Sequence, residues 1–309
     1  MILFLIALIE IVSANDATVT YRERLPLVVA LDPTTRTFHY KGCPDVRPGE
    51  ERVSPAAAQL RGFKAHWCAS LRKEEYAVRT ERRVPRDSAH IAVLFIGNSL
   101  TYFNEMPRMT QQIGAPESRP LFVDAVTQSG ASLEDLWIRT EALKRIWQEH
   151  WDYVILQERG GSAARDRGEL FHKYLGMFAA EARKSGATPV LFMTWNAGSE
   201  DFFRSAARRA NAGLLPVGLA WADLLARGDF SRLDWDGTHP NVAGSYLIAS
   251  TVYATIYDKF PRDLPFDFRH LATANEFYDK ALLEQALNDD QARMIQRAAW
   301  RAVQRVKNP

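Results

Sequence analysis

The stretch VLFIGNSLTYF, residues 93–103, decides the fold of the larger part of this chain. Its apolar residues 93–96 show little polar alternation, as in a strand that is covered on both faces. The run stops at Gly97, where the absence of a side chain permits a tight turn. Ser99 follows two residues later, and a Ser or Asn that caps a helix would explain such a turn on purely structural grounds. The stretch predicts a buried strand, a sharp turn and a serine lifted out at the end of the strand.

Short apolar runs of the same kind recur after residue 89. We expect buried strands at residues 91–96, 121–126, 153–157 and 189–194, with a weaker pattern at 214–217. Between them, Ser132 and Asp135 resemble a capping box ahead of a helix that contains Leu136, Trp137, Leu143 and Ile146. Further helices fit residues 170–184, 200–211, 221–227 and 242–257. Strands that alternate with helices at this spacing predict an α/β domain with a parallel sheet.

Residues 15–88 have a different pattern. They contain two strand-like pieces at 27–30 and 36–40 and a short helical pattern at 55–62. A charged, proline-containing stretch at 72–87 suits a linker. We therefore expect a small α+β module at 15–88, a main domain at 89–262 and a C-terminal extension at 263–309, where residues 274–307 predict one or two amphipathic helices.

Composition narrows the classes of partner. The chain has 309 residues, of which 47% are hydrophobic and 25% charged, and its net charge is +2. These values are ordinary for a globular protein, and the small net charge gives no reason to expect a nucleic-acid partner.

The first fourteen residues are a candidate signal peptide. Residues 1–9 are almost entirely apolar, and Val12-Ser13-Ala14 has the small residues that a signal peptidase accepts. The apolar part lacks a preceding Lys or Arg, and Glu10 interrupts it, so a buried N-terminal segment of a cytoplasmic protein is the alternative. The stretch is short for a bilayer span. We expect export to the periplasm or the medium, with no stable membrane span.

The two cysteines, Cys43 and Cys68, could form a disulfide in an oxidising compartment or remain free thiols in a cytosol. The order of His39, Cys43, a short helix and Cys68 resembles a small zinc module in which four Cys hold the metal. Leu71 stands where that module would have its fourth ligand, and structural zinc normally needs four protein ligands. We therefore expect no metal site.

A serine becomes a useful nucleophile only when a base accepts its proton. Among the seven histidines, His239 has the most suitable setting, in DWDGTHPNVAGSYLIAS, residues 234–250. Asp236 lies three residues earlier, a spacing at which a turn can bring its carboxylate onto the imidazole. Asp234 is a rival with a less suitable spacing, and a surface loop with a helix-capping Asp is the structural alternative.

Taken together, Gly97-Asn98-Ser99 near the start of the domain and Asp236-Gly237-Thr238-His239 near its end resemble the SGNH (GDSL-like) hydrolase superfamily. The resemblance covers about residues 90–258. It implies a three-layer α/β/α sandwich with a flavodoxin-like parallel sheet. It also implies a catalytic triad of Ser99, His239 and Asp236, an acyl-enzyme intermediate and no cofactor.

The resemblance further implies an oxyanion hole. Its donors would be the backbone N–H of Ser99, that of Gly130 in VTQSGASLEDLW, residues 126–137, and a side-chain amide after the third strand. The superfamily usually has Asn there, whereas this chain has Gln157 in YVILQERGG, residues 153–161. Some SGNH subfamilies of unassigned function resemble this Leu-Gln-Glu version. Asn98, Trp195 and Asn196 are candidate substrate-lining residues, although Trp195 could equally pack beneath the loop.

The fold does not determine the substrate class. Because no extended lipid-binding stretch is visible, we expect an ester of a short acyl group such as acetyl, on a small molecule or a carbohydrate. An acyltransferase that uses the same serine is one alternative. A non-catalytic carbohydrate- or envelope-binding protein is the other.

Overall fold

The structure is a computed structural model that describes residues 29–40, 49–53, 58, 61–65, 89–160, 168–195, 198–271 and 286–308. The chain divides into two compact units, Met1–Arg83 and Val84–Pro309. The candidate signal peptide, both cysteines of the candidate disulfide (Cys43 and Cys68) and Asn196 lie outside the described residues.

The smaller unit contains a four-stranded sheet in the order β3-β1-β2-β4. Its strands are β1 (Val29–Asp32), β2 (Thr37–Tyr40), β3 (Arg52–Val53) and β4 (Lys64–Ala65). The β1–β2 pair is antiparallel, and Phe38 and Leu31 pack with Ala58 and Phe63 in a small core. His39 is buried, and its Nε2 lies 3.1 Å from Thr37 Oγ1. Within the described part of the chain, no cluster of three or more His, Cys, Asp or Glu could hold a metal.

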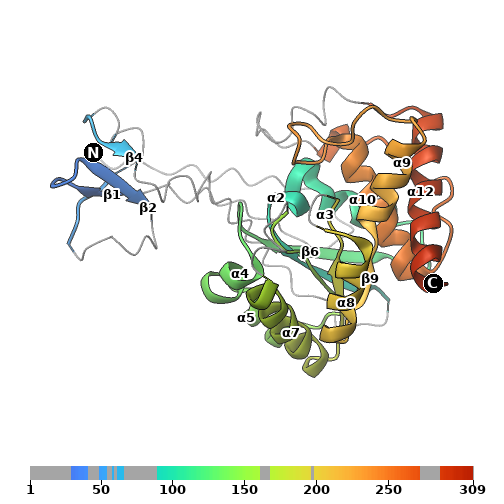
Figure 1. The fold of residues 1–309 in the computed structure, drawn as a ribbon, viewed down its shortest axis with the longest axis horizontal. Helices are drawn as coiled ribbons and strands as arrows, with labels where there is room; N and C mark the ends of the chain where they lie inside the picture. The colour runs from blue at the N-terminus through green and yellow to red at the C-terminus, as the bar shows by residue number, and fades with distance from the viewer. Residues whose placement is uncertain are drawn as a thin grey trace. The chain divides into compact units, whose positions relative to one another are not determined.

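The larger unit is built on a sheet of five parallel strands (Figure 1). They are β5 (Ile91–Gly97), β6 (Leu121–Thr127), β7 (Tyr153–Leu156), β8 (Thr188–Phe192) and β9 (Gly213–Leu215). Their order, β6-β5-β7-β8-β9, is the flavodoxin-like order. The predicted strands and the predicted fold class are therefore confirmed.

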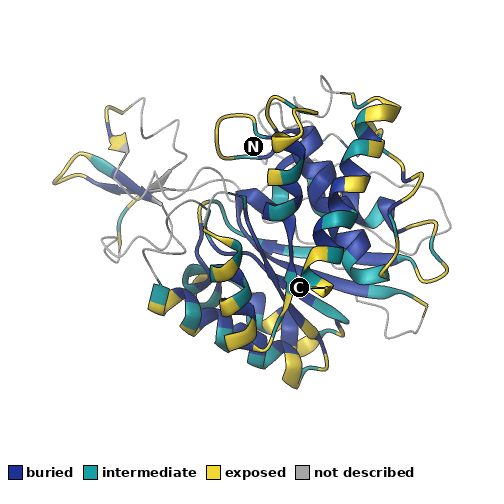
Figure 2. Cartoon of the chain, turned by 45° about the vertical axis from the view of Figure 1, so that its right-hand side comes forward, coloured by how far each residue is buried: buried dark blue, intermediate teal, exposed yellow. Residues whose placement is uncertain are grey.

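Two helical layers cover the sheet. One contains α4 (Leu133–Arg139), α5 (Ala142–Gln148), α7 (Gly168–Lys184) and α8 (Glu200–Ala210). The other contains α3 (Met106–Ile113), α9 (Val217–Ala226), α10 (Val242–Tyr257) and α12 (Asp289–Lys307). Figure 2 shows the sheet as a buried layer between them. Alternate residues of β5 enter opposite cores, Phe95 on the α10 side and Leu94 on the α7 side, which explains why its sequence shows no polar alternation.

The helices differ from the sequence predictions in two of the places described next. The single helix expected after Ser132 is two helices, because the chain breaks at Thr140, whose hydroxyl donates to the Leu136 carbonyl and accepts from Ala142 N. Helix α3 was not expected; its first turn holds Pro107, a residue suited to that position. In contrast, α12 lies within the predicted C-terminal range and packs against α9 and α10. Among the described residues, no helix is both long and apolar enough to cross a bilayer.

Candidate active site

Ser99 lies at the point in the sheet where ligands gather in open α/β folds. Strand β5 is flanked by β6 and β7, so the chain leaves β5 at the switch in strand order, beyond its carboxyl end. Gly97 ends the strand, and Ser99 begins the short helix α2 (Ser99–Tyr102). Asn98 caps this helix, because its Oδ1 accepts from Leu100 N at 3.1 Å. Ser99 is only 7% exposed, so its hydroxyl is held within a packed setting.

The structure brings Ser99, His239 and Asp236 into one hydrogen-bonded chain. His239 Nε2 lies 2.9 Å from Ser99 Oγ, across 140 residues of sequence. His239 Nδ1 lies 2.8 Å from Asp236 Oδ2. An ionised carboxylate only accepts, so Nδ1 carries the proton and Nε2 is free to accept from the serine hydroxyl. This is the arrangement that a general base needs.

The Asp236 carboxylate is held as an anion by its own loop. Burial alone would raise its pKa, but hydrogen bonds from the backbone and ring of His239, and from Thr238 N, outweigh burial and lower the pKa below its ordinary value of 3.8. Asp236 is therefore ionised at neutral pH, where it can orient the imidazole. The rival Asp234 is engaged elsewhere, since its Oδ1 accepts from Gly237 N at 2.6 Å and from Arg232 at 2.7 Å.

Gln157 is buried behind the serine turn, which corrects the prediction that its amide is an oxyanion donor. Its Oε1 accepts from Asn98 N at 2.8 Å and from Thr101 Oγ1 at 2.9 Å. A backbone N–H can only donate, so the side-chain oxygen must face the turn. The Nε2 donates to the Glu158 carbonyl, and the residue is fully buried. Gln157 thus braces the turn and presents no donor to an open site.

The contact between Gln157 and Thr101 also explains why residue 97 is glycine. A Cβ added at Gly97 would lie 2.4 Å from Thr101 Oγ1 and 2.6 Å from Gln157 Oε1. Both distances are too short for a real Cβ atom. Glycine is therefore required here because neighbouring atoms approach the backbone closely, and the φ of Gly97 is not unusual. Gln157 and the serine turn, residues 97–101, therefore pack tightly against each other.

The loop that carries Gly130 is tied to the serine turn. Asn98 Nδ2 donates to the Ala131 carbonyl at 2.8 Å, which holds the loop after β6 beside the end of β5. Gly130 is exposed and has a φ of +64°, a left-handed conformation that favours glycine. Arg159 Nε donates to the Gly130 carbonyl at 2.8 Å. The Gly130 backbone N–H remains a candidate oxyanion donor.

The three candidate substrate-lining residues have different outcomes. Asn98 is buried, and both ends of its amide are engaged in the turn, so it does not line an open site, contrary to the prediction. Trp195 is half-buried and stacks on Trp221, with ring centroids 4.0 Å apart and planes within 4°. That stack favours the packing alternative for Trp195. Asn196 is outside the described residues.

Two contacts of the segment that contains His239 and Pro240 were not expected from the sequence. The Phe103 ring stacks on the His239 imidazole, with centroids 4.3 Å apart and planes within 13°. Asn104 Nδ2 donates to the Pro240 carbonyl at 2.9 Å. Neither contact has a local sequence signal, because each joins residues more than 130 positions apart.

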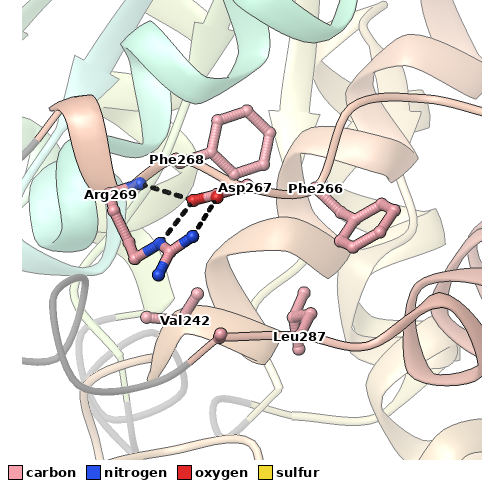
Figure 3. Close-up of a pocket in the computed structure, with 7 residues that line it drawn as sticks. Val242, Phe266, Asp267, Phe268, Arg269 and Leu287 are labelled. Atoms are coloured by element: carbon pink, nitrogen blue, oxygen red, sulfur yellow. Dashed lines mark hydrogen bonds and ion pairs between the residues drawn. The ribbon is translucent and has the colours of Figure 1, made fainter.

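A small cavity lies beside the start of α10 (Figure 3). It has a volume of about 210 Å³, and the apolar side chains of Val242, Phe266 and Leu287 contribute to its lining. On one side Asp267 pairs with Arg269, whose hydrogen bond lowers the pKa of that carboxyl to about 2. Val242 follows His239 by three residues, so the cavity adjoins the segment that carries the candidate base.

Three solved structures are similar to part of this chain. A protein of Slackia heliotrinireducens, provisionally described as an SGNH hydrolase, is 26% identical, with a TM-score of 0.43, and the match covers 52% of this chain and 95% of that one. TesA is 18% identical with a TM-score of 0.42, covering 54% of this chain and 98% of that one. Protein YxiM of Bacillus subtilis is 14% identical with a TM-score of 0.42, covering 56% of each chain. No family model and no curated protein matches the chain. The chemistry of the site is therefore argued from its own geometry.

Proposed function

We propose that this chain is a serine hydrolase of the SGNH type that cleaves an ester through an acyl-enzyme. The observation that carries the proposal is the unbroken chain of hydrogen bonds from Ser99 Oγ through His239 to Asp236. A serine that only caps a helix has no need of an imidazole on its hydroxyl. An imidazole so placed, with an ionised carboxylate behind it, is the pairing that activates a serine.

In the proposed reaction Ser99 Oγ attacks the ester carbonyl carbon while His239 Nε2 takes the hydroxyl proton. The resulting oxyanion accepts hydrogen bonds from the backbone N–H groups of Ser99 and Gly130. His239 then returns the proton to the leaving alcohol, which leaves an acyl group on Ser99. Water, deprotonated by His239, releases the acid and restores the serine. Asp236 holds the imidazole and stabilises its cationic form throughout.

For the substrate we propose an ester of a short acyl group, such as acetyl, on a small molecule or a carbohydrate. The support is the absence of an extended lipid-binding stretch in the sequence. The same acyl-enzyme could pass its acyl group to an alcohol, so transfer is an outcome that the test must measure alongside hydrolysis.

The proposal is tested by labelling with a fluorophosphonate, which reacts with activated serines, followed by peptide mass spectrometry. We expect the label on Ser99 of the full chain and turnover of acetyl esters, with both lost in Ser99→Ala. Ser199→Ala is the matched control. Ser199 caps α8 by accepting from Phe202 N and should cost about 1 kcal/mol of stability without loss of labelling.

An unlabelled Ser99, or a Ser99→Ala protein with full turnover, would remove the nucleophile and the proposal with it. A panel of p-nitrophenyl esters of increasing chain length and of acetylated sugars then ranks the substrates. Added alcohols measure transfer: ester products in place of free acid would identify an acyltransferase.

A further inference from the structure

We infer that Asn104 is a positioning residue for the catalytic base: it fixes the His239 segment to the segment that carries the nucleophile. The inference rests on the proposed function for its catalytic meaning. It follows from contacts that the triad itself does not use.

Asn104 connects two parts of the chain that are far apart in sequence. Its Nδ2 donates to the Pro240 carbonyl at 2.9 Å and to Ser245 Oγ at 2.8 Å. Pro240 directly follows His239, and Ser245 lies in the first turn of α10. The Ser245 hydroxyl in turn donates to the Phe103 carbonyl at 3.4 Å. The amide of Asn104 therefore ties the chain just after the base to the chain just after the nucleophile.

The residue before Asn104 completes the contact with the base. The Phe103 ring lies against one face of the His239 imidazole. Phe103 and Asn104 follow helix α2, whose first residue is Ser99, so the segment that presents the nucleophile also packs on the base. Any shift of this segment would change both the ring contact and the Pro240 hydrogen bond.

The exposed loop that carries His239 needs contacts from outside the loop to fix its position relative to Ser99. The side chains of His239 and Asp236 are 26% and 46% exposed, respectively, and the hydrogen bonds of the Asp236 carboxylate lie within the loop itself. Bonds of that kind shape the loop but do not set its distance from Ser99. In contrast, Asn104 is only 1% exposed, and it bonds to Pro240, which lies 136 residues later in the sequence.

The backbone at Asn104 and Glu105 has an unfavourable left-handed conformation. Asn104 has φ 55° and ψ 31°, and Glu105 follows with φ 53° and ψ 35°. Left-handed conformations are unfavourable for residues other than glycine, although Asn tolerates them best, and they persist where the surroundings hold them. Two in succession turn the chain between α2 and α3, with the Asn104 amide facing the start of α10.

Asn104→Gly tests the inference, because glycine keeps the left-handed backbone and removes only the amide. Asn211→Gly is the matched control. Asn211 also has a left-handed φ, 49°, but it is exposed at the end of α8, on the opposite face of the sheet from α10. Both variants should fold, and only the first should affect His239.

Two readouts separate positioning from a merely structural role. We expect kcat of Asn104→Gly to fall about 10- to 100-fold with KM nearly unchanged, because small misplacements of a catalytic group carry costs of this size. We also expect the ¹⁵N resonances of the His239 ring to move or broaden, as the ring leaves its fixed contacts with Asp236 and Ser99. Asn211→Gly should leave both readouts at their wild-type values.

Wild-type kcat together with unmoved His239 resonances in Asn104→Gly would overturn the inference and leave the proposed function intact. The ring resonances need no turnover, so they test positioning even if the protein hydrolyses no ester. If Asn104→Gly does not fold, Ser245→Ala removes one acceptor of the same amide. That variant should shift the His239 resonances in the same direction by a smaller amount, and unmoved resonances there would equally overturn the inference.

Discussion

The two halves of the candidate site are held in opposite ways. The Ser99 turn, residues 97–101, is buried. Gln157 Oε1 accepts from Asn98 N and Thr101 Oγ1, and the Ala131 carbonyl accepts from Asn98 Nδ2. The loop from Asp234 to His239 lies at the surface, and its hydrogen bonds are largely internal: its own carboxylates accept from its backbone, and Trp235 N donates to the His239 carbonyl. Packing of the core therefore positions Ser99, whereas additional contacts must hold His239 beside it.

This difference separates stability from activity. A change in the buried turn should affect the free energy of unfolding and the rate together, because the same contacts serve packing and geometry. A change in the exposed loop should affect the rate with little effect on folding. The following variants test that division.

Asp236→Asn should have the largest effect on turnover. The amide can still accept from Thr238 N and His239 N, but it no longer holds Nδ1 protonated or stabilises the imidazolium. A loss of about 10⁴ in kcat is the expected size for this change in a serine triad. The free energy of unfolding should change by less than about 1 kcal/mol, since the Asp236 side chain is 46% exposed and its interactions are screened by water. Steady-state kinetics and urea unfolding measure the two effects, and Asp234→Asn, at the rival carboxylate, is the control that should keep most of the turnover.

Gly97→Ala should affect folding and activity together. The new Cβ would overlap Thr101 Oγ1 and Gln157 Oε1, and overpacking of a buried site typically costs about 1–3 kcal/mol. Gly176→Ala is the matched control, because a Cβ there meets nothing within 4 Å and Ala suits the interior of α7 better than Gly. We expect thermal unfolding to show a loss in the first variant and a small gain in the second. Equal stability of the two variants would mean that the turn is not packed as tightly as described.

Gln157→Met and Thr101→Val should have the smallest effects on turnover, and they show whether Gln157 supports the serine turn or acts as an oxyanion donor. Removing the Gln157 amide leaves Asn98 N–H buried without its acceptor, at a cost of about 1–3 kcal/mol. Because both variants break one network, their effects on unfolding should be less than additive in a double-mutant cycle.

An oxyanion donor would behave differently in the same cycle. Gln157→Met would then lower kcat about 10²- to 10³-fold at unchanged stability, and Thr101→Val would have no effect on kcat. Gln112→Met, at a glutamine that lies 2.9 Å from the His270 ring on the surface, controls for the substitution itself.

Much of the fold was predictable because strands of a doubly covered sheet have a local signature. The five strands follow from short apolar runs, and the alternation with helices makes the sheet parallel. The break at Thr140 was missed because it depends on one hydroxyl that bonds back to the preceding turn. Helix α3 was missed because the left-handed residues Asn104 and Glu105 separate it from α2, and neither residue is a glycine that would mark the turn.

The residues of the site divide in the same way. Ser99, Asp236 and His239 could be selected by residue type and local spacing, since a strand end and a three-residue turn are short-range features. Gln157 was selected for its position but assigned the wrong contact. Its position follows from β7, whereas the direction of its amide depends on which groups of the serine turn it meets. Asn98 was misjudged for the same reason.

By itself, the sequence determined the parallel α/β sheet, the end of β5 at Gly97 and the types of residue that can form a proton relay. The tertiary structure alone decided that His239 lies within 2.9 Å of Ser99, that Gln157 faces the turn and that Asn104 joins the two segments. The physical reason is range. Apolar periodicity and turn chemistry act over a few residues, whereas these contacts join positions 59 to 140 residues apart and exist only once the sheet and its helical layers have packed.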